Sequence, residues 1–489
     1  MAPQIVVHGH FYQPPRENPW TGVIDDQPGA APFSNWNELV HAECYKPNAF
    51  VTLELPNETK VVNNFEKISF DVGPTLLSWL QDEQPETYGR IIEADKASLT
   101  ATGHGNAIAQ AYHHTILPLS PLRDIRTEVI WGLEDFRHRF DRDPEGMWLP
   151  EAAASDVVLG VLIDAGVRFT ILAPWQAANW RESSGRWIDT RDQPVDAGRP
   201  YRYLHPDGSG RELIIFFYDA DIARQIAFEQ ALSSAEKFVG LFASRGGPLV
   251  HAATDGETYG HHHKFSEVGL ALALFVEAER NSLQVTNYGA ALDQIPVHHE
   301  VLIAQGRGTS WSCAHGVGRW ERDCGCWTGG QPDWDQKWRA PLRAALKVVR
   351  DAADDAYGRL GHLVLADPWG ARDRYINVLT GGTSFEEFAR REATEPAGEE
   401  AGGRIRDLLE MQRMAMAMFT SCGWFFNDIS GIETVQVLRY AARALDFIEL
   451  LEQPVPLEAF LAILGGARSN LLDRGTGADI FASIERPVG

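Results

Sequence analysis

Short apolar runs alternate with segments of helical period along the chain up to about residue 335. The runs are rich in β-branched residues and predict strands at 4–11, 113–119, 146–151, 167–174, 212–219 and 248–257. Helical periodicity predicts helices between or after them, at 71–82, 122–140, 155–166, 221–244 and 266–280. Strands that alternate with helices indicate parallel βα units, and the length of the pattern favours a barrel over a sandwich. We therefore expect the α/β fold class.

Two regions depart from this alternation. Residues 200–219 predict a hairpin closed at Asp207–Gly210, which would be an insertion on the barrel. After about residue 335 the chain is rich in Ala, Leu, Arg and Glu, and its periodicity predicts helices at 336–358, 384–392, 403–420 and 431–451. We expect a barrel domain over residues 1–330 and an α-helical region over residues 331–489.

The charge of the chain limits its partners. Its 489 residues carry a formal net charge of −23, so nucleic acid and anionic membrane surfaces would repel it. A neutral substrate such as a sugar polymer is compatible with this charge, although surplus acid also serves solubility alone. Neither a secretory signal nor an apolar stretch long enough to span a bilayer is visible. Five cysteines are a sparse and odd number for a disulfide scaffold, so we expect a cytoplasmic protein.

Tryptophan is frequent, with 15 residues, and many of them stand beside Gly, Pro, Asp or Glu rather than inside apolar runs. Trp424 follows Gly423, and we take Trp148 and Trp311 as further candidates. A tryptophan in a polar loop offers a flat apolar face on which the C–H faces of sugar rings stack. The alternative is that a large domain fills its core with tryptophan. We expect several of these side chains to line a carbohydrate cleft.

Carboxylates stand where predicted strands end. Glu151 closes the apolar run GMWLPE, and Asp255 and Glu257 follow the run PLVHAAT. In βα barrels, catalytic groups lie at the C-terminal ends of strands. Two carboxyl groups from separate strands suit glycoside cleavage, in which one attacks as an anion and the other supplies a proton. Glu151 could equally be a first-turn acid that stabilises a helix N-terminus.

Histidines accompany these carboxylates. His8 and His10 stand two apart on the first predicted strand, so their side chains share one face. Together with Gln13 they suggest hydrogen bonds to substrate hydroxyls, or ligation of a metal. His104 stands in a glycine-rich turn.

Two loops carry residue types that bind metals. The first holds Asp255, Glu257 and three consecutive histidines at 261–263, which could bind a divalent ion. The second holds Cys313, His315, Cys324 and Cys326, whose spacing is not that of a standard zinc knuckle. For the second loop the sequence leaves three alternatives: a zinc site, a redox pair of Cys324 and Cys326, or small thiols that pack in a Trp- and Gly-rich loop.

Four motifs in this order resemble the conserved regions of glycoside hydrolase family 57. They are HxHxxQPP at the N-terminus, GxGN before ILPL, WxPE and DGExxG, and the resemblance covers about residues 5–315. WxPE and DGExxG are the specific parts. The chain departs from the usual HxHQPP start, because Phe11 and Tyr12 stand before Gln13. A fifth, tryptophan-bearing region of the family is best matched by GTSWSCAHGVGRW, which contains Trp311.

The resemblance implies a distorted (β/α)7 barrel followed by a helical region that helps to close the active site. It implies a retaining double displacement on an α-glucan or maltooligosaccharide, with Glu151 as nucleophile and Asp255 as acid/base. Family activities include α-amylase, 4-α-glucanotransferase and branching enzyme, and no cofactor is expected. We expect the substrate to be bound by His8, His10, Gln13, His104, Trp148, Glu257, Trp311 and Trp424.

The mechanism sets physical requirements, and other classes of function set different ones. Retention needs the two carboxyl groups roughly 5–5.5 Å apart, and burial and Glu151 should raise the pKa of Asp255. A metal-dependent hydrolase of a related seven-stranded barrel, such as a deacetylase or an α-mannosidase-like enzyme, would need His8, His10 and an acidic partner to hold a metal. A non-catalytic glycan-binding relative would be expected to lose a carboxylate, and this chain keeps both. The segment 421–431, with Trp424 and Asp428, either reaches the cleft or ends a helix.

Overall fold

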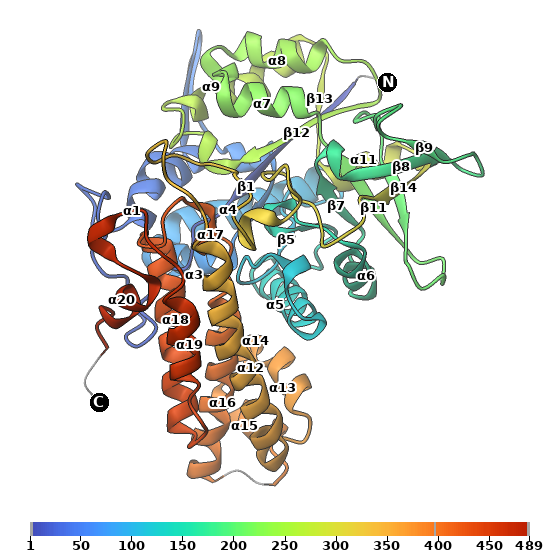
Figure 1. Ribbon diagram of the computed structural model, residues 1–489. Coiled ribbons are helices and arrows are strands. Elements are labelled where there is room, and N and C mark those ends of the chain that lie inside the picture. Colours follow the sequence, from blue (N-terminus) through green and yellow to red (C-terminus); the bar gives the residue numbers. More distant parts are fainter. Residues whose placement is uncertain (1–2, 396–397, 487–489) are drawn as a thin grey trace. The chain divides into compact units, whose positions relative to one another are not determined.

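The computed structural model describes residues 3–395 and 398–486, which form two compact units (Figure 1). The first unit comprises residues 1–13, 26–111 and 139–311, and the second comprises residues 14–25, 112–138 and 312–489. This division differs from a single boundary at residue 330, because two early segments pack with the helical part. The Arg372 guanidinium, for example, binds the Asp124 carboxylate at 3.0 Å. The sequence alone gives no sign of this contact, because the two residues are far apart along the chain.

Strand β1 (Gln4–Phe11) lies at the centre of a four-stranded parallel sheet of the first unit. It is buried along its whole length and pairs in parallel with β12 (Leu249–Asp255), β4 (Ser69–Val72) and β13 (Gln284–Val285). The run QIVVHGHF suits this position, because strands of a parallel sheet are covered on both faces and need near-continuous apolar sequence.

Parallel pairing continues through the next strands of the first unit. Ladders or single parallel bridges join β4, β5, β6, β7 and β11 in that order. The bounds are β5 (Ala109–Gln110), β6 (Met147–Trp148), β7 (Phe169–Leu172) and β11 (Glu212–Phe217). Just after β11, the main-chain N–H of Asp219 donates to the carbonyl of His251 on β12 at 2.8 Å. The predicted α/β class is therefore confirmed.

The predicted hairpin is present in the structure. β10 (Tyr201–Leu204) and β11 are antiparallel, and residues 205–211 form the turn. β10 extends this sheet to β14 (His299–Ile303), β8 (Ala177–Glu182) and β9 (Ile188–Asp189). A separate hairpin consists of β2 (Val51–Leu55) and β3 (Glu58–Val62).

Helices of the first unit follow the strands, and side-chain caps explain where several begin. Ser155, Asp219 and Ser234 each accept a main-chain N–H at the start of α6, α7 and α8. The helices are α1 (Trp36–Val40), α2 (Lys46–Ala49), α3 (Pro74–Glu83), α4 (Pro85–Thr102), α6 (Asp156–Asp164), α7 (Ala220–Phe228), α8 (Ala235–Ala243), α9 (Ser266–Leu272), α10 (Ala278–Arg280) and α11 (Tyr288–Gln294). The segment predicted as one helix at 221–244 is divided, because a 3-10 turn at Ala231–Ser233 separates α7 from α8.

The second unit is helical, as the sequence predicts. Its long helices α12, α16 and α18 run side by side, and the short helix α19 packs against α12 (Figure 1). The bounds are α5 (Leu122–Phe140), α12 (Arg339–Val364), α13 (Pro368–Arg374), α14 (Ile376–Leu379), α15 (Phe385–Glu392), α16 (Glu399–Ala417), α17 (Cys422–Phe425), α18 (Ile432–Leu450), α19 (Leu457–Leu464) and α20 (Gly477–Ala482). Across the described residues, none of these helices combines the length and the apolar character that crossing a bilayer requires.

The prediction of a strand at 113–119 is wrong. Thr115 forms only a single bridge, with Thr420, and Leu117–Leu119 forms a 3-10 turn. Pro118 fixes its own backbone angle and has no N–H to donate to a ladder, so an apolar composition alone does not make this segment a strand.

Candidate active site

His10, Asp255 and Glu151 all stand at the C-terminal ends of parallel strands. The register of β1 and β12 sets His10 directly opposite Asp255. Glu151 follows the last residue of β6, Trp148, by three positions. The fold thus brings the ends of strands that are far apart in sequence to one edge of the sheet, as expected for βα units.

Asp71 on β4 joins the two N-terminal histidines. Its Oδ1 lies 3.0 Å from Nε2 of His8, and its Oδ2 lies 2.8 Å from Nδ1 of His10. The other ring nitrogen of His8 lies 3.1 Å from the Ser69 hydroxyl. Burial alone would lower the pKa of His10, but the Asp71 carboxylate, helped by Asp255, raises it to about 9. His10 is therefore a cation at neutral pH, held beside Asp255.

Trp148 and Trp311 connect the histidines to Glu151. The fully buried Trp148 stacks on both His8 and His10, with ring centroids 4.9 and 5.1 Å apart. Trp311 meets Trp148 edge to face at 4.9 Å, and its indole N–H donates to Oε2 of Glu151 at 3.1 Å. Trp148 therefore supports the imidazoles from within the core, whereas Trp311 touches the carboxylate itself.

The backbone of Glu151 has an unusual conformation. Its φ of 58° and ψ of 23° lie in the left-handed region, and Ala152 follows with a φ of 48°. Such a conformation is costly for any residue with a Cβ, and it is characteristic of sites where the surrounding structure imposes a side-chain direction. Glu151 is not a first-turn acid of the next helix, because α6 begins only at Asp156 and is capped by Ser155.

Asp255 keeps solvent-accessible surface although protein closely surrounds its carboxyl group. Desolvation by these surroundings is the main cause that raises the pKa of Asp255 to about 6. The charge of His10 opposes the rise, and the Glu151 and Asp71 carboxylates add to it. The group therefore contains a carboxyl that holds its proton up to about pH 6, in electrostatic contact with a second carboxyl.

Glu257 fastens the segment that follows β1. Its Oε1 accepts hydrogen bonds from the Tyr45 hydroxyl at 2.6 Å and from the main-chain N–H of Tyr12 at 3.0 Å. Burial raises the pKa of Glu257 to about 7. The Phe11 ring packs on Gly256, where a Cβ would lie only 2.3 Å from the ring, so glycine is required there. The two residues that precede QPP thus anchor the DGE turn, and Glu257 acts as a positioning residue.

Three residues of the group escaped the sequence reasoning. Asp71 is the next-to-last residue of the buried strand SFDV, and the signal that marked Glu151 and Asp255, a carboxylate near a strand end, also fits it. Tyr218 follows β11, and burial, with Asp255 nearby, raises its pKa above the ordinary value. Tyr45 lies in a π-helical segment, His41–Tyr45, and carries no sequence signal.

The structure does not bring His104 into this group, and it buries Trp424. His104 precedes β5 and so lies at the N-terminal end of the strands, where it contacts Glu145 at 2.8 Å and Asp293 at 2.9 Å. Trp424 is fully buried in the second unit, and its indole N–H donates to the carbonyl of Arg339 at 3.2 Å. Trp424 therefore has no exposed surface on which a sugar ring could stack.

The remaining predicted residues pack among their neighbours. Gln13 is nearly buried and hydrogen-bonds the side chain of Tyr45. Within the histidine run at 261–263, His261 contacts a Glu43 carboxylate oxygen at 2.5 Å and His263 contacts the carbonyl of Ala227 at 2.8 Å. These histidines have separate partners and do not converge with Asp255 on a common point.

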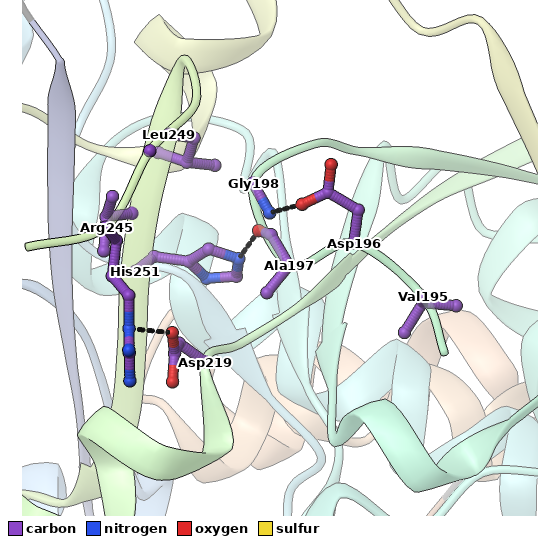
Figure 2. A pocket seen from close by; sticks show the side chains of 10 residues that line it. Val195, Asp196, Ala197, Gly198, Asp219, Arg245, Leu249 and His251 are labelled. Atoms are coloured by element: carbon purple, nitrogen blue, oxygen red, sulfur yellow. Dashed lines mark hydrogen bonds and ion pairs between the residues drawn. The ribbon is translucent and has the colours of Figure 1, made fainter. Parts of the chain in front are cut away.

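A cavity of about 250 Å³ lies beside the N-terminal half of β12 (Figure 2). At its wall the Arg245 Nε donates to Asp219 at 2.9 Å, and His251 contacts the carbonyl of Ala197 at 3.1 Å. Asp255 stands at the opposite end of the same strand, so this cavity is separate from the carboxyl pair.

Known proteins resemble the chain along its whole length. The model of glycosyl hydrolase family 57 matches residues 7–302, and that of a domain of unknown function, DUF3536, matches residues 334–488. A Methanocaldococcus jannaschii protein with a provisional α-amylase name is 22% identical over 328 residues, which cover 64% of this chain and 61% of that protein. The chain thus spans about three fifths of the length of this curated relative.

Two solved structures share the fold. An exo-type maltose-forming amylase from Pyrococcus sp. ST04 has a TM-score of 0.73 at 15% identity, over 95% of this chain and 83% of that one. A GH57-type branching enzyme from Pyrococcus horikoshii has a TM-score of 0.57 at 15% identity, over 100% and 98% of the two chains. The family model covers more than half of the chain and includes the strand-end groups His10, Glu151 and Asp255. The chain therefore belongs to glycosyl hydrolase family 57.

Proposed function

We propose that the chain is a retaining enzyme that acts on α-glucans, with Glu151 as the nucleophile and Asp255 as the general acid/base. The proposal rests on one observation above all: Asp255 has its pKa raised to about 6 beside the second carboxyl group, Glu151. The amylases and the branching enzyme among the relatives support an α-glucan as the substrate class.

The two carboxyl groups divide the chemistry between them. In the first step, the Glu151 carboxylate attacks the anomeric carbon while Asp255 gives its proton to the glycosidic oxygen. The bond to this oxygen breaks, and a covalent glycosyl-enzyme forms. In the second step, Asp255 takes a proton from water or from a sugar hydroxyl, whose oxygen displaces Glu151. Water gives hydrolysis and a sugar hydroxyl gives transfer, and both retain the anomeric configuration.

The neighbouring side chains fit these roles. The Trp311 indole N–H fixes the orientation of the Glu151 carboxylate. The cationic His10 stands opposite Asp255 and stabilises the carboxylate that remains after proton donation. Asp71 in turn holds His10 and keeps it charged.

We also propose that the parallel strands of the first unit close into a distorted (β/α)7 barrel. The seven strands of this barrel would be β1, β4, β5, β6, β7, β11 and β12. The parallel pairs from β12 through β11 support this reading, and the main-chain bond from Asp219 to His251 supports closure between β11 and β12. The carboxyl pair then lies at the C-terminal mouth of the barrel.

The test uses Glu151→Gln with amylose, amylopectin and maltooligosaccharides, the products being resolved by size and linkage. We expect turnover to fall on the order of 10⁴-fold or more, because the nucleophile is lost. Glu182→Gln is a matched control, since Glu182 is exposed on β8 and should leave the rate unchanged. Near-normal turnover by Glu151→Gln would refute the assignment.

A second variant identifies the step. Glu151→Ala, supplied with an α-maltosyl fluoride and azide, should form the β-maltosyl azide, because azide enters the space left by the nucleophile and inverts the anomeric centre once. Rescue that gives the α-azide, or no rescue together with full activity on amylose, would exclude Glu151 as nucleophile.

A metal-dependent hydrolase is the weaker alternative. It needs His8 and His10 as ligands, but both ring nitrogens of His8 already contact Ser69 and Asp71, and Nδ1 of His10 contacts Asp71 as well. Binding a metal there would require these bonds to break.

A further inference from the structure

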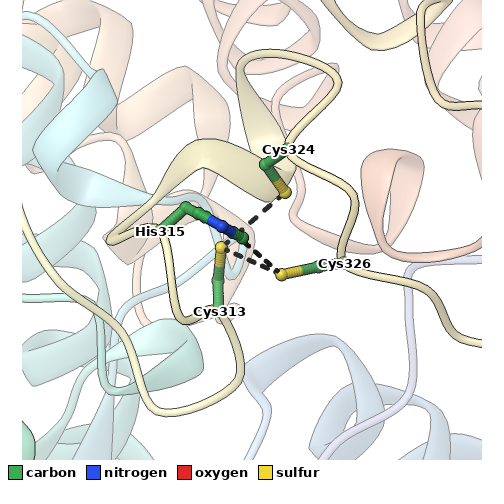
Figure 3. Close-up of side chains that lie close together, drawn as sticks. All are labelled: Cys313, His315, Cys324 and Cys326. Atoms are coloured by element: carbon green, nitrogen blue, oxygen red, sulfur yellow. Dashed lines mark hydrogen bonds between the residues drawn. The ribbon is translucent and has the colours of Figure 1, made fainter.

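Three cysteines and one histidine converge on one point in the second unit (Figure 3). The Sγ of Cys313 lies 3.9 Å from that of Cys324 and 3.7 Å from that of Cys326, which in turn lies 3.4 Å from Nδ1 of His315. All four ligand atoms lie within 4.8 Å of one another. Among the residues that the structure describes, this is the group whose donor atoms are arranged to hold a metal ion.

The separations match a tetrahedral zinc site. With Zn–S bonds of about 2.3 Å and Zn–N bonds of about 2.0–2.1 Å, tetrahedral geometry sets two sulfurs about 3.8 Å apart and a sulfur and a nitrogen about 3.6 Å apart. The observed values of 3.9, 3.7 and 3.4 Å lie close to these. A disulfide would instead need a sulfur separation of about 2.05 Å and would leave the third thiol and the imidazole unused.

The donor set suits zinc in its charge as well. A divalent ion with three thiolates carries a net charge of −1.

Two buried arginines could balance this negative charge. Arg339 is fully buried, and Cys324 and Cys326 act on its charge. In the described structure its Nε and Nη1 have no hydrogen-bond partner, and the same holds for Nε of the buried Arg319. Buried cations without full compensation are costly, and an adjacent anionic centre offsets that cost.

The loop that carries the four residues has little regular structure of its own. Between residues 312 and 338 the only helical turn is a 3-10 turn at Gly318–Trp320. The loop is nevertheless fastened to the α17 segment, since the Trp320 indole N–H donates to the carbonyl of Ser421 at 3.1 Å and Thr328 Oγ1 donates to that of Phe425 at 3.1 Å. A metal cross-link between its two arms would explain how this loop keeps one shape.

We propose that Cys313, His315, Cys324 and Cys326 bind one structural Zn²⁺. Four protein ligands fill a tetrahedral shell, which is the arrangement of structural rather than catalytic zinc sites. On binding, the three thiols release their protons to solvent and their sulfurs bind the metal. The ion then holds the 312–338 loop in the conformation in which it contacts the α17 segment.

The first test is made on the whole wild-type protein, purified from zinc-supplemented medium without chelators. Elemental analysis should find about one zinc per chain. X-ray absorption should find a shell of sulfurs at about 2.3 Å with one nitrogen at about 2.0–2.1 Å. Cobalt exchange should give thiolate-to-metal charge transfer and the d–d bands of a tetrahedral site. A protein without zinc, a shell of nitrogen and oxygen only, or a mass that reveals a disulfide would overturn the proposal.

The second test uses single variants. Cys326→Ser and Cys324→Ser should lose stoichiometric zinc and the charge-transfer band, and Cys422→Ser, a thiol outside the group, should keep both. Where a variant fails to fold, the wild-type measurements still decide. Zinc retained in full by both ligand variants would overturn the assignment. This result is independent of α-glucan activity, since none of these residues belongs to the carboxyl pair.

Discussion

The carboxyl pair and the thiol group are held in opposite ways. The carboxyl pair stands at the ends of strands, where parallel pairing fixes His10 opposite Asp255. The thiol group stands on a loop whose only helical turn is Gly318–Trp320. Backbone hydrogen bonds of a sheet hold strand ends in place, whereas a loop positions its side chains less precisely unless further contacts or a cross-link fix it.

The comparison also shows how each group deals with charge. At the strand ends, the protein itself supplies the compensation, through Asp71 and His10 and through the Trp311 hydrogen bond to Glu151. At the loop, the proposed metal ion would compensate the three thiolates, and the resulting anionic centre would compensate two arginines whose guanidinium nitrogens lack some hydrogen-bond partners. The predictions below separate the two cases, from the largest effect to the smallest.

Asp255→Asn should cause the largest loss among these. We expect kcat/KM on amylose to fall about 10²–10⁴-fold, because the proton donor is lost. The loss should shrink with α-glycosyl fluorides, whose leaving group needs no proton. Steady-state kinetics on both substrates measures the difference. An equal loss on both would mean that Asp255 does not act as the acid.

Trp311→Phe keeps a ring but removes the hydrogen bond to Glu151. We expect kcat to fall on the order of 10²-fold with little change in KM, because the bond orients the nucleophile. Trp175→Phe is the matched control, since Trp175 is 51% exposed and its indole N–H donates to the carbonyl of Ser310. Equal effects of the two substitutions would contradict a role for Trp311 at Glu151.

The pH profile tests the shifted carboxyl. Asp255 acts as an acid only while protonated, and its pKa is raised to about 6. The rate constant kcat/KM should therefore fall as pH rises through about 6, by about tenfold per pH unit beyond it. A profile that stays flat to pH 9 would exclude Asp255 as the group that limits the alkaline side.

Removal of zinc should act on stability and not on this profile. Chelation should lower the apparent Tm by roughly 5–15 °C, because the ion binds the folded state. The fall of kcat/KM near pH 6 should stay at the same pH, since the charged groups that shift the pKa of Asp255 are His10, Glu151 and Asp71. Calorimetry and kinetics on the same chelated sample provide the check. A fall of kcat/KM that shifts in pH when the metal is removed would show that the metal affects the titration of Asp255.

Glu151→Gly and Glu151→Ala should differ by the smallest amount and with an unusual sign. At an ordinary position Ala is the more stable of the two. At a φ of 58° a Cβ is strained, so we expect the glycine variant to be more stable by about 1 kcal/mol. Chemical denaturation of both variants measures this. Greater stability of the alanine variant would show that the left-handed backbone is not kept.

Much of the fold and site could be predicted from residues alone. Carboxylates and histidines at the ends of apolar runs marked Glu151, Asp255, His8 and His10, because a strand presents its end at the edge of a sheet. The helices after residue 335 followed from their periodicity. Asp71, which contacts both histidines, was missed although it carries the same signal. His104 was expected to bind substrate near the carboxyl pair, but it lies at the N-terminal end of the strands, opposite to that pair.

The sequence by itself determined which residue types can react and where strands and helices form, since both follow from side-chain chemistry and local periodicity. Only the tertiary structure decided which of them meet. It set Asp255 against His10, gave Glu151 its left-handed backbone, buried Trp424 in the helical unit and gathered Cys313, His315, Cys324 and Cys326 around one point. The physical reason is that register, burial and loop closure depend on contacts between distant segments, and no local pattern encodes these contacts.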